Sequence, residues 1–121
     1  MPTPKQHYKK ALYNEKFFHD VKSIYTDWAV TGIFYAALHL IDAFLSSKGI
    51  HPKDHKDRAN YAGRIKELKL IYSYYRYLYD HSINARYTMT KISTINAEQI
   101  YKDYFLPIKN DIVKILNYSE K

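Results

Sequence analysis

The chain has 121 residues, enough for one domain that buries a hydrophobic core without covalent cross-links. It has no cysteine, which excludes disulfide bonds and thiolate zinc sites, and its three glycines and four prolines argue against a turn-rich all-β fold. The net charge is +7 and 14 residues are tyrosine. Such a composition suits contacts with phosphates and bases, although tyrosines at helical spacing more often belong to the core and its boundary.

Two long helices are predicted in the first part of the chain. The first begins at Pro4, a residue suited to the first helical turn, and runs to about Val21. The second is opened by Thr26 as its cap and closes at Lys48-Gly49. Because this second helix is apolar on most of its circumference, we expect it in the middle of a helical bundle.

One line of polar side chains interrupts the apolar surface of the second helix. Tyr35, His39, Asp42 and Ser46 follow at spacings of four, three and four, so they share one face. Such a line is either satisfied at a helix–helix or dimer contact or forms part of a ligand cleft. With His39 and Asp42 the stretch from 28 to 45 is too short and too polar for a membrane span, and no signal peptide is visible. We therefore expect a soluble, cytoplasmic protein without membrane contacts.

Two further helices are predicted after a charged loop. Asp54 is placed to cap a short helix that runs through about Arg64. A longer helix runs from about Lys66 to Arg86. Its inward face is predicted from the helical spacing of Ile71, Tyr75, Leu78, Ser82 and Ala85.

The last helix is predicted to start at Asn96, with Gln99 three residues later as a variant of the capping box. Pro107 removes one backbone hydrogen bond inside this helix, so a kink is expected there. The β-branched stretch 88–95 before it reads as a loop. The fold class that follows is all-α: one domain over residues 1–121, an up-and-down antiparallel four-helix bundle with one additional short helix.

Two segments carry a resemblance to a known family. FYAALHLIDAFLSSKGIHPKDHKD, from Phe34, and LYDHSINARY, some twenty residues later, resemble the second helix, the following histidine-bearing loop and the later leucine-rich helix of HEPN domains. The resemblance implies a small helical bundle, commonly a homodimer, without a cofactor. It implies one of two roles: a metal-independent ribonuclease, often a toxin neutralised by a nucleotidyltransferase-fold antitoxin, or a non-catalytic module that binds RNA, a nucleotide or a partner.

The ribonuclease motif of that family places a histidine four to six positions after an arginine, and Arg76 and His81 fit this spacing. In such a site the histidine moves the 2′-hydroxyl proton and the arginine stabilises charge on the phosphorane. Tyr77 departs from the polar residue usual in the motif, and alignment of LYDHSINARY puts Ser82 where many members keep the arginine. In the alternative interpretation Arg76 pairs with Asp80 one turn later.

The excess positive charge gathers after the second helix. Residues 48–69 hold seven Lys or Arg against three acidic residues, a net charge of +4. We expect this flank to face RNA or a nucleotide, unless it is simply a solvated surface. The predicted binding residues are Tyr35, His39, Lys53, His55, Lys56, Arg58 and Arg86.

A metal site is not expected from the sequence. His51 and His55 are four residues apart, but Pro52 disfavours a regular helix through both, and no fourth ligand is evident. Our first hypothesis is thus a cytoplasmic, dimeric, HEPN-like protein that contacts RNA or a nucleotide, as the HEPN member of a toxin–antitoxin or antiviral pair. The alternatives are an active ribonuclease using Arg76 and His81 across a dimer, and an adaptor that docks a nucleotidyltransferase-type partner.

Overall fold

The computed structural model of the chain describes residues 1–88 and 91–118. Within these ranges the elements are α1 (Pro4–Val21), α2 (Thr26–Ser47), α3 (His55–Arg64), α4 (Lys66–Tyr87), α5 (Thr94–Ile100), the π-helical turn η1 (Tyr101–Phe105) and α6 (Leu106–Leu116). No β-strand occurs in the described residues, so the all-α prediction is confirmed.

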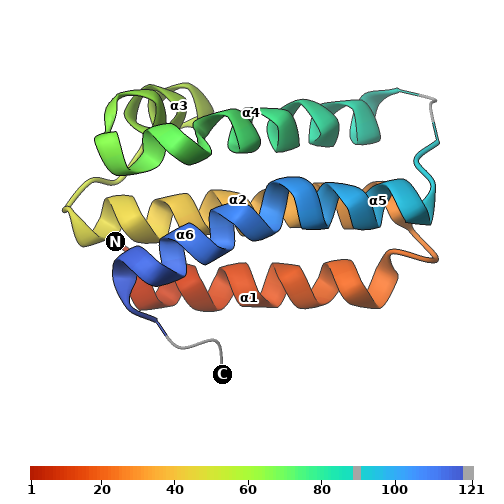
Figure 1. The fold of residues 1–121 in the computed structure, drawn as a ribbon, viewed down its shortest axis with the longest axis horizontal. Coiled ribbons are helices and arrows are strands. Elements are labelled where there is room, and N and C mark those ends of the chain that lie inside the picture. The colour runs from red at the N-terminus through yellow and green to blue at the C-terminus, as the bar shows by residue number, and fades with distance from the viewer. Residues whose placement is uncertain (89–90, 119–121) are drawn as a thin grey trace.

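The long helices lie side by side and the chain passes back and forth between them. Figure 1 shows α1, α2 and α4 each running opposite to the one before, and the α5–α6 arm returning along them. The short α3 lies beside the start of α4. Because α2 contacts α1, α4, α5 and α6, it is the central element of the fold.

The apolar character of α2 is explained by this central position. Fifteen of its residues are buried, in an almost unbroken run from Ala29 to Leu45. By length and composition alone α2 could cross a membrane, but most of it is covered by the other helices, as in the core helix of a soluble protein. The buried run begins one residue after the start of the apolar stretch 28–45 discussed above, because Trp28 is 58% exposed.

Helix starts were predicted less well than helix interiors. Asp54 caps α3 as expected, since its side chain accepts a hydrogen bond of 2.8 Å from the backbone N–H of Asp57. Thr26 is not a cap but the first residue of α2, and its hydroxyl donates to the carbonyl of Lys22 instead. Asn96 is also not a cap: Ser93 caps α5 and accepts a hydrogen bond from the Asn96 N–H.

The last helical arm changes its hydrogen-bond pattern just before the proline at which a kink was expected. η1 is a π-helical turn in which the N–H of Leu106 donates to the carbonyl of Tyr101, five residues back. Pro107 then occupies the first turn of α6, where its missing N–H is tolerated. The wider turn takes up the local change that the proline imposes.

One buried ion pair joins the two ends of the sequence. Glu15 of α1 accepts a hydrogen bond of 2.8 Å from Lys109 of α6 and another of 2.5 Å from the hydroxyl of Tyr101. Both charged side chains are only 10% exposed. This pair fixes the α5–α6 arm against α1, and because its partners are 94 residues apart no local pattern predicts it.

Candidate functional site

The polar line on α2 is satisfied within the chain. Asp42 is buried and pairs with α3, His39 contacts α1, and the Ser46 hydroxyl donates to the carbonyl of Pro2. Tyr35 is half-buried, with its ring against Phe34. Of the two interpretations given above, the one in which the line is satisfied by packing contacts therefore holds for Asp42, His39 and Ser46.

Asp42 and Arg58 form a two-pronged ion pair between α2 and α3. Arg58 Nε lies 2.7 Å from Asp42 Oδ1, and Nη2 lies 3.0 Å from Oδ2. The two side chains are only 8–10% exposed. Because the guanidinium of Arg58 is bonded to a buried carboxylate, Arg58 does not serve as a free cation. Its role is to join α3 to α2.

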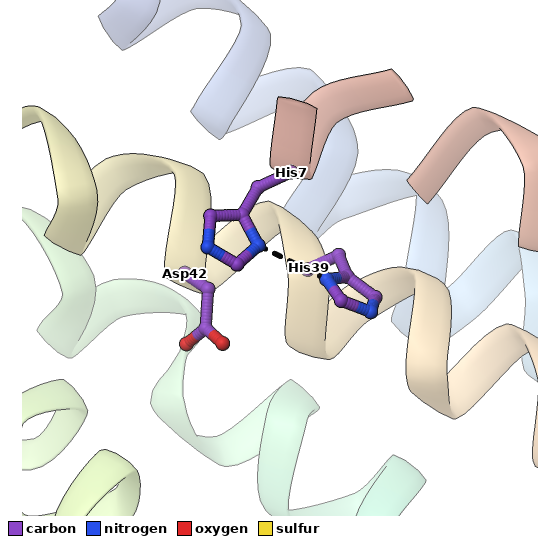
Figure 2. Close-up of side chains that lie close together, drawn as sticks. All are labelled: His7, His39 and Asp42. Atoms are coloured by element: carbon purple, nitrogen blue, oxygen red, sulfur yellow. Dashed lines mark hydrogen bonds between the residues drawn. The ribbon is translucent and has the colours of Figure 1, made fainter. Parts of the chain in front are cut away.

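His39 meets a histidine from the first helix. The Nδ1 atoms of His7 and His39 are 3.1 Å apart, and Figure 2 shows the two rings turned toward each other. Burial lowers the pKa of both rings, and that of His39 falls to about 4. Both imidazoles are therefore neutral at pH 7, with one Nδ1 donating to the other.

A groove of about 310 Å³, which we call the α3–α4 groove, opens between those two helices. Two cations, two small or amide residues, one histidine and three tyrosines line it: Lys56, Arg76, Ala59, Asn60, His55, Tyr72, Tyr75 and Tyr79. No acidic side chain is among these lining residues. The groove thus combines positive charge with aromatic rings.

Further positive charge lies next to the α3–α4 groove. Burial lowers the pKa of His55, and the nearby cations of Arg58 and Arg86 lower it further. Arg58 Nη1 is 3.4 Å from His55 Nδ1. Arg86 has one buried guanidinium nitrogen with no hydrogen-bond partner among the described residues. His55 thus lies in a positive electrostatic environment, which favours an anion beside it.

A second groove, the α4–α5 groove, is larger, at about 660 Å³, but differs in chemistry. Lys91 and Asp103 both line it, and most of its other polar groups are uncharged. At one wall Tyr77 stacks on Tyr104 with ring centroids 3.7 Å apart, and His81 packs against Tyr77. Its opposed charges make it a weaker site for phosphate than the smaller groove.

The two predicted catalytic residues line different grooves. Arg76 lies in the α3–α4 groove, with its guanidinium 5.9 Å from the ring centre of Tyr79. His81 lies in the α4–α5 groove. The ion pair of Arg76 with Asp80 that we considered is not among the ion pairs of the described residues. Joint action on one phosphate would therefore need a second subunit, and the catalytic assignment stays a prediction.

The other predicted binding residues are brought together only in part. His55 and Lys56 line the α3–α4 groove with Arg76, Arg58 lies 3.4 Å from His55, and the charge of Arg86 acts on His55. Lys53, Tyr35 and His39 do not line it; the backbone N–H of Lys53 donates to Asp57 in the loop before α3. The binding roles of all these residues remain predictions.

Sequence reasoning missed His7 and the tyrosines of the groove. His7 is 32 residues from its partner His39, so no local spacing connects the two. Tyr72, Tyr75 and Tyr79 do recur at helical spacing, a pattern that more often indicates the core and its boundary than a binding site.

Comparison with known proteins gives one family. The model of the HEPN domain matches residues 6–117, nearly the whole chain. Neither a curated protein nor a solved structure matches the sequence.

Proposed function

Since the chain belongs to the HEPN domain family, many of whose members are nucleases or otherwise related to RNA, we propose that it binds single-stranded RNA, or the phosphates of a nucleotide, through the α3–α4 groove. The observation that carries the proposal is the set of side chains in this groove. Lys56 and Arg76 line it without any acidic neighbour among the lining residues, and the charge of Arg86 acts on its histidine. Phosphate contacts dominate the affinity of proteins for nucleic acids.

The aromatic side chains of the groove suit an unpaired base. Tyr79 packs against His55 and Phe34 with ring centroids 5.5 Å apart in each case, so its ring is held in place. Tyr75 also lines the groove but is 1% exposed, and burial raises its pKa to about 12, so its hydroxyl stays protonated. A rigid ring beside two cations stacks on any base, which favours single-stranded RNA without strong sequence preference.

Fluorescence anisotropy with a labelled RNA of about 12 nucleotides tests the proposal, since single-strand sites cover roughly 4–16 nucleotides. The buffer contains EDTA, so that no metal contributes. The double variant Lys56→Ala/Arg76→Ala should weaken binding at least about tenfold, a loss of roughly 1.4 kcal/mol. The control Lys9→Ala/Lys114→Ala removes the same charge from exposed positions outside the groove. Equal weakening by both variants, or no binding by the parent chain, contradicts the proposal.

The same RNA distinguishes the second hypothesis. Cleavage without metal that is lost in His81→Ala would make the chain a ribonuclease of the family's kind, acting as a dimer because Arg76 and His81 line different grooves. Light scattering on the purified chain measures whether the predicted homodimer exists. Co-purification of a nucleotidyltransferase-type protein, with neither RNA binding nor cleavage, would favour the adaptor. Cytoplasmic location and membership of a toxin–antitoxin or antiviral pair belong to this proposal as well.

A further inference from the structure

The contact between α1 and α2 contains a group of metal-ligating side chains that the proposed RNA site does not use. His7 comes from α1, and His39 and Asp42 come from α2 one turn apart. One potential ligand atom from each of the three lies within 4.8 Å of the others. Figure 2 shows the three side chains together, with the two rings facing each other.

The spacing of the two rings matches a shared metal ion. A tetrahedral ion with metal–nitrogen bonds of 2.0–2.1 Å holds two imidazole nitrogens about 3.3 Å apart. The Nδ1 atoms of His7 and His39 are 3.1 Å apart, so an ion fits between them after a shift of a few tenths of an ångström. In the metal-free chain a single proton lies between these two nitrogens.

We propose that His7, His39 and Asp42 form a binding site for one divalent transition-metal ion of the zinc type, held between the two Nδ1 atoms with the carboxylate as third ligand. The shared Nδ1 proton moves to the Nε2 of the same ring, which remains a neutral imidazole. Neutral imidazoles are the ligands that zinc, cobalt, nickel and copper ions prefer, whereas magnesium and calcium prefer oxygen.

The surroundings of the three side chains favour this assignment. Burial lowers the pKa of both histidines, so protons do not compete for the ring nitrogens at pH 7. In Figure 2 the Asp42 carboxylate points away from the rings, and Arg58 uses one lone pair on each of its oxygens. Each carboxylate oxygen has a second lone pair, which can accept the ion when Asp42 turns toward the rings.

A bound ion would tie the first helix to the core helix. The first turn of α1 is already fixed by the capping box of Thr3 with Gln6 and by the hydrogen bond between Pro2 and Ser46. His7 therefore presents its ring from a rigid turn, which reduces the cost of ordering the site on binding. We expect the ion to serve stability, with at least one coordination position left to water.

Titration of the untagged full chain with Co²⁺, followed by displacement with Zn²⁺, tests the site. We expect one ion per chain, a visible cobalt spectrum of tetrahedral intensity, and a thermal midpoint that rises with Zn²⁺ concentration. His7→Gln and His39→Gln should each weaken Zn²⁺ binding at least about tenfold. His19→Gln on the same helix, but exposed near its far end, is the matched control and should bind as the parent does. His51 is unsuitable as a control because its charge acts on His7.

Nuclear magnetic resonance of the parent chain keeps the test decisive if a variant fails to fold. Zn²⁺ should move the ring signals of His7 and His39 together and place the remaining proton of each ring on Nε2. Absence of one-to-one binding at micromolar Zn²⁺ overturns the proposal. So does binding that survives both glutamine variants, or that is lost equally in His19→Gln.

Discussion

Arg58 of α3 holds Asp42 of α2 through two hydrogen bonds of 2.7 and 3.0 Å, across 16 residues of sequence. Residues 48–69, which include α3 and the first turn of α4, carry a net charge of +4, and Arg58 lies within that basic segment. The pair anchors the first turn of α3 to α2, and from this turn His55 and Lys56 line a groove with Arg76 of α4. The pair is therefore both a structural contact and the support of the candidate RNA site.

Arg58→Met should lower the free energy of unfolding by about 3–5 kcal/mol, because it leaves the Asp42 carboxylate buried without its partner. Urea unfolding measures the loss. Lys16→Met is the matched control, since it breaks a pair with Asp20 whose side chains are 76% and 57% exposed. We expect no measurable change there. The double variant Asp42→Asn/Arg58→Met should be less destabilised than Arg58→Met alone, because it leaves no unpaired charge. If Arg58→Met loses as little stability as Lys16→Met, the buried pair is not essential for the fold.

The fold was predictable because its strongest signals are local. The inward face of α4 was read from helical spacing, and all five predicted residues are buried: Ile71, Tyr75, Leu78, Ser82 and Ala85. The stop at Lys48-Gly49 was also read correctly, since Gly49 adopts a positive φ of 74°. Hydrophobic periodicity determines which face is buried, and this information is contained in a few turns of sequence.

The candidate site was predictable only where charge was concentrated in sequence. His55 and Lys56 were named because the segment around them is basic, and Arg76 was named for a motif, not for the groove it lines. The contacts of Asp42 and His7 depend on how helices pack, which no local pattern records. The start of α5 was also predicted wrongly: Ser93 and Asn96 are both good caps three residues apart, and it is Ser93 that accepts the capping hydrogen bond.

Glu15→Gln should lower the free energy of unfolding by about 2–3 kcal/mol, because a charged partner of Lys109 and of the Tyr101 hydroxyl is replaced by a neutral amide. Glu98→Gln serves as the control. Its pair with Lys22 has side chains that are 44% and 26% exposed, and it should cost well under about 1 kcal/mol. Urea denaturation of the two variants at pH 7 compares them directly. An equal loss in both would contradict the view that the α1–α6 pair fixes the last helical arm.

Salt dependence separates the charged from the aromatic part of the RNA site. Arg76→Ala should reduce the slope of log affinity against log salt concentration by about 0.7, the value for one phosphate contact to a single strand. Tyr79→Leu should weaken binding by about 1–3 kcal/mol at every salt concentration and leave the slope unchanged, since it removes stacking but no charge. Anisotropy titrations over a series of potassium chloride concentrations give both numbers. A slope that changes with Tyr79→Leu, but not with Arg76→Ala, would exclude this assignment of roles.

RNA affinity should rise as the pH falls below 7, and His55 should be the cause. In the free chain burial lowers the pKa of His55, and Arg58 and Arg86 lower it further, while the carboxylates of Asp42 and Asp54 act in the opposite direction. The ring is therefore neutral at pH 7. A phosphate bound beside it favours the protonated ring, so its pKa is higher in the complex than in the free chain, and binding takes up a proton. Affinity then increases as the pH falls through the usual histidine range near 6.5 and levels off below the lowered pKa of the free ring.

Anisotropy titrations between pH 5.5 and 8, taken as about the range of histidine titration, compare the parent chain with His55→Gln. The variant should keep most of its affinity at pH 8 and lose most of the rise toward acid pH, whereas His19→Gln should follow the parent at every pH. If His55→Gln retains the full rise, the groove does not place its phosphate next to this histidine.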